Sequence, residues 1–251
     1  MKLVLLTALG VGGATLFGTV LGFIFRKISH KFSDIVLSFA AGVMLCAAIT
    51  GLILPSLGQG GSMPLLVTIA GILCGAVFLN LLDKLVPHLH RLAGADQESH
   101  PEGSARLNKV LLFVMAIAIH NLPEGIAAGV GFGSGNNAQA LTIAAGIALQ
   151  NVPEGMVIIG PMLAAGIPPK TTFLCAAGTG VIEVVGTLLG YFAVSLSTAI
   201  LPFALAFVGG TMLYVISDEM IPETHHSETR GVTYSLLLGF CLMLAMDHFL
   251  G

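Results

Sequence analysis

Apolar residues are grouped along the chain in eight long blocks, which short stretches of polar residues, glycine or proline separate. A helix needs about 20 apolar residues to cross the hydrocarbon core of a bilayer, and each block has about that length. Residues within the blocks do not alternate between polar and apolar, as they do in strands of membrane barrels. The pattern predicts an all-α polytopic membrane protein with eight transmembrane helices, over residues 3–24, 35–56, 64–84, 108–131, 139–163, 171–196, 201–222 and 231–250.

The composition supports this prediction and argues against a soluble domain. Hydrophobic residues make up 55% of the chain and charged residues 9%, whereas roughly a quarter of a typical soluble domain is charged. The start of the chain lacks the short apolar core and cleavage site of a signal peptide, so the first block is expected to be a span. We expect one transmembrane domain over residues 1–251, with its longest polar connection at about residues 86–107.

The basic residues predict the orientation of the spans. Nine of the ten Lys and Arg residues lie in or beside the connections after the first, third, fifth and seventh spans, and only Lys2 lies on the opposite side. Connections rich in Lys and Arg face the cytoplasm under the positive-inside rule. Both termini are therefore expected to be extracytoplasmic, and the connection at about 86–107 is expected in the cytoplasm.

The fourth and fifth spans carry similar motifs near their centres. The fourth contains HNLPEG and the fifth contains QNVPEG. Residues three or four apart share a helix face, so each motif presents a compact set of nitrogen and oxygen donors. Consecutive spans run in opposite directions, so the motifs predict a pseudo-two-fold site near the membrane midplane. The donors are His120, Asn121 and Glu124 on one helix, and Gln150, Asn151 and Glu154 on the other.

The proline of each motif changes the backbone beside the carboxylate. Pro123 and Pro153 have no N–H group, and their rings crowd the carbonyl four residues earlier. A carbonyl freed in this way must face protein, water or an ion, because lipid cannot satisfy it. Proline and glycine are also common in membrane helices for packing reasons, but packing does not explain two glutamates at mid-membrane depth.

A third carboxylate, Glu183, lies near the middle of the sixth span in GTGVIEVVGTLLG. No Lys or Arg lies at comparable depth in any span, so the natural partner of these carboxylates is a cation. Nitrogen and oxygen donors without a thiolate suit zinc, iron(II), manganese, cobalt or cadmium better than copper(I). The sequence thus predicts a centre for a divalent transition metal.

The eight spans, HNLPEG in the fourth, QNVPEG in the fifth and a glutamate in the sixth together resemble the Zrt/Irt-like (ZIP) metal transporters, particularly their prokaryotic GufA-like branch. LLDKLVPHLH at the end of the third span and ISDEMIPETHH at the end of the seventh are similar to that branch as well. The resemblance covers essentially the whole chain. It implies a transporter, not an enzyme, in the prokaryotic cell (inner) membrane, which moves zinc, iron, cadmium, manganese or cobalt into the cytoplasm with zinc preferred.

The resemblance also implies how the transported metal is bound. It implies a binuclear centre between the fourth, fifth and sixth helices, in which the two motif glutamates bridge the ions. The first site would use His120, Glu124, Gln150 and Glu154, and the second would use Asn121, Glu124, Asn151, Glu154 and Glu183. The resemblance further implies a homodimer and an elevator-like motion, in which spans 1, 4, 5 and 6 slide against spans 2, 3, 7 and 8. The expected partners are metal ions, the lipid bilayer and a second copy of the chain, and no nucleic acid.

The chain departs from the family pattern at two positions. Asn151 stands where some relatives carry aspartate, which lowers the negative charge of the second site and makes a second ion harder to balance. Asp218 stands where some carry histidine. Acidic and histidine residues at the end of the seventh span are a candidate exit path or secondary metal site, or else an ordinary charged helix end: Asp218, Glu219, Glu223, His225 and His226. His88 and His90 are a second candidate for weak metal capture, or else belong to a solvated connection.

Two other functions fit the same residues. An intramembrane metal-dependent hydrolase also uses His and Glu ligands, although the HExxH motif is absent from the chain. A proton-coupled carrier or channel for another solute would use the carboxylates as a proton relay. Turnover of a substrate in detergent would identify the hydrolase, and metal bound between the fourth and fifth spans would identify the metal transporter.

Overall fold

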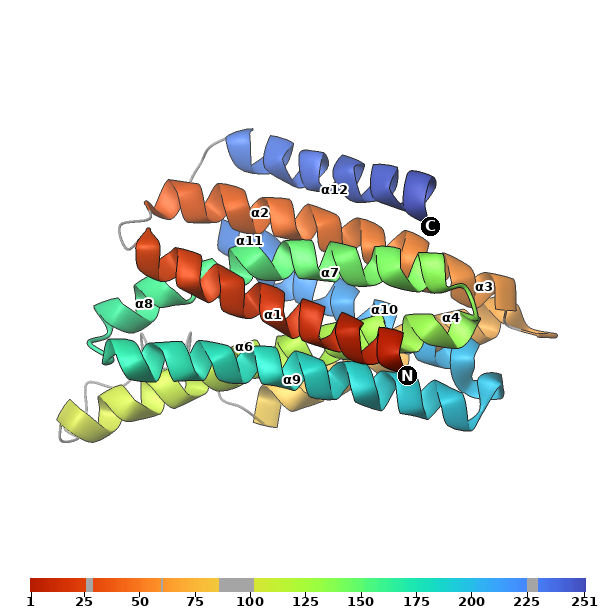
Figure 1. The fold of residues 1–251 in the computed structure, drawn as a ribbon, viewed down its shortest axis with the longest axis horizontal. Coiled ribbons are helices and arrows are strands. Elements are labelled where there is room, and N and C mark those ends of the chain that lie inside the picture. Colours follow the sequence, from red (N-terminus) through yellow and green to blue (C-terminus); the bar gives the residue numbers. More distant parts are fainter. Residues whose placement is uncertain (26–28, 60, 86–101, 225–229) are drawn as a thin grey trace.

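The computed structural model describes residues 1–25, 29–59, 61–85, 102–224 and 230–251. All regular elements in these ranges are helices, and the long ones run side by side in one bundle (Figure 1). Seven of the described helical runs are long and apolar enough to cross a membrane. They match the predicted spans except the fourth, which lies within the 30-residue helix α6 (Glu102–Gly131). The prediction of an all-helical protein with membrane-spanning helices is confirmed.

Within the described ranges, some spans are single α-helices and others are composite. The single ones are α1 (Lys2–Ile24), α4 (Pro64–Leu85), α6, α9 (Pro169–Leu196) and α12 (Arg230–Leu250). The second span consists of α2 (His30–Cys46), η1 (Ala47–Ile53) and α3 (Leu54–Gln59). The fifth consists of α7 (Asn137–Val157) and α8 (Ile159–Ala164), and the seventh of α10 (Leu201–Val215), η4 (Ile216–Met220) and α11 (Ile221–Thr224). Short 3-10 turns, η2 (Phe132–Ser134) and η3 (Thr198–Ile200), precede α7 and α10.

The second and seventh spans each contain a π-helical segment just before a proline. η1 ends two residues before Pro55, and η4 ends two residues before Pro222. Proline cannot donate to the carbonyl four residues earlier, and its ring crowds that carbonyl. The wider π pattern accommodates this conflict, as where the N–H of Leu54 bonds to the carbonyl of Ile49. Both spans therefore pass a proline without ending.

The helices pack in two groups of four. The first group contains α1, α6, α7 and α9. The second contains the pairs α2–α12 and α4–α10, which are joined mainly through η1, α3 and α11, and α2 also packs on α7 of the first group. Inside the groups the helices approach so closely that glycines meet a neighbour's backbone, as Gly18 meets the carbonyl of Val152. At the boundary between the groups, Gly146 instead meets the flexible side chain of Met243. This grouping is the one that the family resemblance implied for the moving and stationary spans.

An inverted repeat relates the two ends of the chain to each other. α1 packs on α7 as α9 packs on α6, and α2 packs on α12 as α10 packs on α4. The glycine contacts follow the same rule: Gly18 meets the carbonyl of Val152, and Gly186 meets that of Leu122, which holds the same position in the other motif. Both termini lie at the same end of the bundle, as an even number of spans requires (Figure 1). The pseudo-two-fold relation predicted from two motifs thus extends over all eight spans.

Candidate metal centre

The two proline–glutamate motifs lie inside α6 and α7, with each motif proline in a helix interior. Gly125 follows the first glutamate and lies against the backbone of Glu183 in α9. Gly155 follows the second glutamate and lies against the backbone of Thr15 in α1. A β-carbon at either glycine would collide with that backbone, so only glycine allows this approach. The motif glycines therefore bring α1 and α9 up to the two carboxylates.

Glu183 is fully buried, and three side chains donate hydrogen bonds to its carboxylate. Thr15 Oγ1 donates to Oε1 over 2.7 Å, and Asn151 Nδ2 donates to Oε2 over 2.7 Å. Asn121 Nδ2 also donates to Oε1. The three donors come from α1, α7 and α6, so Glu183 joins all four helices of the first group. We refer to Thr15, Asn121, Asn151 and Glu183 as the Glu183 cluster.

Glu124 and Gln150 form a contrasting pair at the centre of the same group. Their exposed fractions are 1% and 0%. The Gln150 amide lies within polar contact of the Glu124 carboxylate, but no hydrogen bond of normal geometry reaches the carboxylate oxygens or the amide atoms. Asn151 Oδ1 is also buried without a partner. A buried polar group left without a partner costs about 1–3 kcal/mol, and more when it is charged. We refer to Glu124 and Gln150 as the Glu124 pair.

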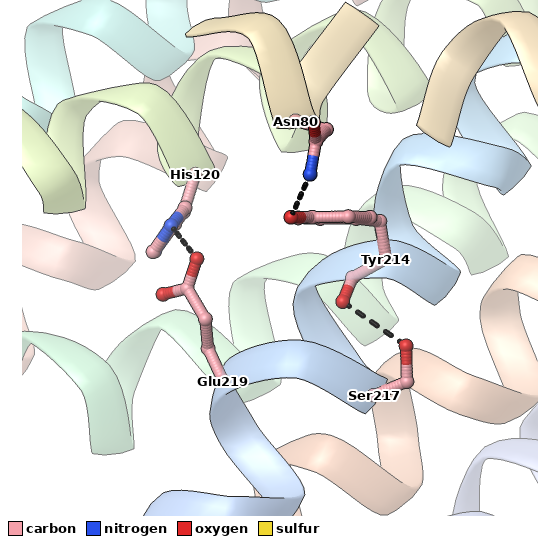
Figure 2. A network of polar contacts seen from close by, with 5 residues as sticks. All are labelled: Asn80, His120, Tyr214, Ser217 and Glu219. Carbon is pink, nitrogen blue, oxygen red and sulfur yellow. Dashed lines mark hydrogen bonds and ion pairs between the residues drawn. The ribbon is translucent and has the colours of Figure 1, made fainter. Parts of the chain in front are cut away.

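His120 and Glu154 complete the first predicted ligand set and are both partly exposed. The charge of Glu154 acts on both His120 and Glu124, which places the three side chains within electrostatic reach of one another. Nε2 of His120 lies 2.8 Å from Oε1 of Glu219 in η4 (Figure 2). Beside this ion pair, Asn80 of α4 donates a hydrogen bond of 2.8 Å to the Tyr214 hydroxyl of α10 (Figure 2). η4 belongs to the second group, so Glu219 connects the metal centre to the other half of the bundle.

The structure brings all seven predicted ligands into one connected centre, listed by helix as His120, Asn121 and Glu124; Gln150, Asn151 and Glu154; and Glu183. In the part of the chain that the structure describes, no three His, Cys, Asp or Glu side chains are already arranged as a metal site. The centre relies instead on amide oxygens as well. Two residues were missed as members: Thr15, because the first span carries no motif, and Glu219, which was assigned only to an exit path.

The remaining candidates are more scattered. Asp218 and Glu223 are exposed, on η4 and α11. His88, His90, His225 and His226 lie outside the described residues.

The donor set fits a divalent cation. Four buried oxygens of the two motifs have no hydrogen bond of normal geometry: two from Glu124, one from Gln150 and one from Asn151. Carboxylate, amide and imidazole donors match borderline divalent metals, whereas no thiolate takes part. A cation among these oxygens would replace the hydrogen bonds that they lack. The buried oxygens therefore offer donors of the kind that a divalent metal prefers, beside the partly exposed His120 and Glu154.

Comparison with known proteins finds similarity to zinc transporters over nearly the whole chain. The family model described as ZIP zinc transporter matches residues 88–247. The chain is 39% identical to zinc transporter GufA of Myxococcus xanthus, over 98% of each chain. It is 37% identical to zinc transporter ZIPB of Bordetella bronchiseptica, over 95% of this chain and 78% of that protein. It is also 29% identical to zinc transporter ZupT of Escherichia coli over the full length of both.

Proposed function

Because the chain belongs to the ZIP family, in its prokaryotic GufA-like branch, we propose that it carries zinc in preference to iron, cadmium, manganese or cobalt, and moves it into the cytoplasm. Family membership makes it an integral inner-membrane protein that transports divalent metal, and not an enzyme. The intramembrane hydrolase is therefore set aside. The carrier of a different solute is not favoured either, since zinc transporters are similar to the chain over nearly all of its length.

The observation that carries the proposal is the Glu124 pair. A carboxylate and an amide lie side by side at mid-bundle with no hydrogen bond of normal geometry to any of their oxygens. A charged side chain at the bilayer centre costs roughly 2.5–3.5 kcal/mol on insertion scales, so such residues pair or bind something functional. None of the other described members of the centre is a Lys or Arg that could neutralise Glu124. A divalent metal substrate supplies the missing positive charge.

We assign the first ion to His120, Glu124, Gln150 and Glu154, and a second ion to the side of the Glu183 cluster. Glu124 and Glu154 would bridge the two ions, as the family resemblance implies, and both glutamates lie within electrostatic reach of each other. Three carboxylates balance one divalent ion with one negative charge to spare, and a second ion reverses the sign. The first ion is therefore expected to bind more tightly than the second.

The proposed direction rests on which members of the centre are exposed. His120 precedes Glu124 in α6, and Glu154 follows Gln150 in α7, so both lie on the side of the centre away from the termini. Glu219 lies on that side as well, near the end of the seventh span. These three are partly exposed, whereas Glu124 and Glu183 are buried. The positive-inside rule assigns that end of the bundle to the cytoplasm, where Lys170 is exposed.

The packing into two groups of four supports an elevator-like motion. The first group holds all seven proposed ligands, and close glycine contacts lock its helices together. The boundary with the second group is lined by side chains, which can exchange partners, and is crossed by the ion pair of His120 and Glu219. We propose that the first group carries the metal past the second. A homodimer is proposed on the family resemblance alone.

Uptake by purified protein in liposomes tests this function. Liposomes containing a zinc-sensitive dye should accumulate zinc with the wild-type chain and with Asp247→Asn, which removes a carboxylate at the far end of α12. Glu154→Ala should accumulate none while it inserts equally well. Iron, cadmium, manganese and cobalt added in turn should compete less well than unlabelled zinc. Uptake by Glu154→Ala at the wild-type rate would reject the assigned site.

Cysteines introduced one at a time test the direction in cells. A cysteine at Thr171, exposed at the start of α9, should react with an impermeant reagent only from the cytoplasmic side. A cysteine at Asn137, exposed at the start of α7, should react only from outside. The parent chain, with its own four cysteines, provides the background. The reverse labelling pattern would overturn the orientation and with it the direction of uptake.

A further inference from the structure

Thr15 belongs to the metal centre although no motif contains it. Its hydroxyl donates to Glu183 Oε1 over 2.7 Å, and the exposed fractions of the two residues are 1% and 0%. Among the described residues, Thr15 is the one side chain of α1 with a hydrogen bond to a proposed ligand, and the Val11 carbonyl of α1 accepts a longer bond of 3.3 Å from Asn151 Nδ2. The contact of Thr15 with Glu183 joins residues 168 positions apart.

The inverted repeat explains why residues 168 positions apart meet here. Gly155 meets the carbonyl of Thr15 just as Gly125 meets the carbonyl of Glu183. One turn later, Thr19 donates to the Thr15 carbonyl and Thr187 donates to the Glu183 carbonyl. Thr15 and Glu183 are therefore equivalent positions of the two repeats, which meet across the pseudo-two-fold axis. One repeat supplies a carboxylate there, and the other supplies a neutral hydrogen-bond donor.

The hydroxyl of Thr15 donates to an oxygen that a metal ion bound by Glu183 would also use. Glu183 Oε1 accepts from Thr15 and Asn121, and Oε2 accepts from Asn151. A metal that uses Glu183 as a ligand must replace at least one of these hydrogen bonds, each of which is strengthened by the charge of the acceptor. Both asparagine amides also direct their nitrogens at Glu183, which turns their oxygens away from it. Asn151 Oδ1 is the buried oxygen that this arrangement leaves without a partner.

We propose that Thr15 is a positioning residue of the metal centre, whose hydroxyl holds Glu183 as the acceptor of the two asparagine amides and thereby limits binding of the second ion. This inference rests on the proposed function of metal transport. Thr15 does not touch the metal in this arrangement. It acts through Glu183, and its effect should fall on the second ion alone.

Zinc binding to purified protein in detergent tests the proposal. Equilibrium dialysis with elemental analysis gives the number of bound ions and the dissociation constant of each. Thr15→Val removes the hydroxyl and keeps the shape, so the dissociation constant of the second ion should fall about tenfold, as expected for the loss of one hydrogen bond to a carboxylate. The constant of the first ion should not change. Thr15→Ser restores a hydroxyl and should return the second constant to the wild-type value.

Thr19→Val is the matched control, because its hydroxyl bonds to the backbone of the same helix one turn away and reaches no ligand. It should bind both ions as the wild type does. If Thr15→Val fails to fold, Thr15→Ala is measured in its place with the same expectation. An unchanged or weaker second ion in the folded variant overturns the role of Thr15. Loss of zinc uptake by the wild-type chain itself would instead remove the proposed function.

Discussion

The two halves of the metal centre, the Glu183 cluster and the Glu124 pair, differ in the hydrogen bonds that their carboxylates accept. Glu183 and Glu124 are both fully buried, yet three side chains donate hydrogen bonds to Glu183, whereas Glu124 has only the Gln150 amide nearby and no hydrogen bond of normal geometry. A buried carboxylate surrounded by neutral donors is stable without an ion, whereas one without donors is costly until a cation arrives. We therefore expect a metal ion to bind at the Glu124 pair without breaking a hydrogen bond of normal geometry, whereas binding at the Glu183 cluster must break at least one.

The halves also differ in their connections to the rest of the bundle. The Glu183 cluster is made entirely by helices of the first group, which glycine contacts hold together. The ligand set around the Glu124 pair includes His120, which pairs with Glu219 of the second group. The Glu183 cluster thus lies inside the first group, whereas the ligand set around the Glu124 pair reaches the boundary between the two groups. Metal exchange at the boundary half can be coupled to relative movement of the groups.

The largest effect should come from neutralising the carboxylate of Glu124 or that of Glu183. Glu124→Gln should weaken binding of the first zinc ion at least about a hundredfold and reduce uptake to background, because changes outside the ligand shell alone cost about 10- to 100-fold. Glu183→Gln should retain the first ion and lose the second. Dialysis and liposome uptake of both variants provide the measurement. Equal loss of the first ion in both would remove the distinction between the halves.

A smaller effect should come from adding a negative charge to the Glu183 cluster. Asn151→Asp removes a donor to Glu183 and adds a carboxylate, so the second ion should bind about tenfold more tightly or better. Tighter binding slows release, so maximal uptake should be equal or lower. Bound zinc per protein, measured at limiting and saturating metal alongside uptake, checks both parts. Unchanged stoichiometry at both concentrations would mean that position 151 is no ligand, and the two-ion arrangement would reduce to one.

The smallest effect should come from the ion pair at the boundary. Glu219→Gln releases His120 from its partner, so the first ion should bind more tightly, by at most about fivefold, since a partly exposed ion pair is worth about 1 kcal/mol or less. Ser217→Ala, in the same π-helical segment, serves as the control with unchanged affinity. Weaker binding of the first ion in Glu219→Gln would instead make Glu219 a ligand of that ion.

The sequence predicted the spans and the primary centre because both depend on local patterns. Long apolar blocks define membrane helices, and the repeated HNLPEG and QNVPEG motifs identify six of the seven proposed ligands, with Glu183 following from its depth.

What the sequence did not predict depends on pairs of distant residues. Thr15 is an ordinary polar residue in an apolar span until the inverted repeat brings it to Glu183. The contact of Glu219 with His120 joins the seventh span to the fourth, and no spacing along the chain predicts it. The π-helical segments before Pro55 and Pro222 were also missed, because proline in a span is compatible with a kink, a break or a wider helix.

The most direct test of the central claim is to locate zinc in crystals of the protein by anomalous scattering, at limiting and then at saturating metal. At limiting zinc we expect one peak between α6 and α7, within about 2.0–2.2 Å of a Glu124 oxygen and of His120 nitrogen, with the Glu183 hydrogen bonds intact. At saturating zinc a second peak should appear beside Glu183. A first peak at Glu183, or elsewhere with none at Glu124, would contradict the account.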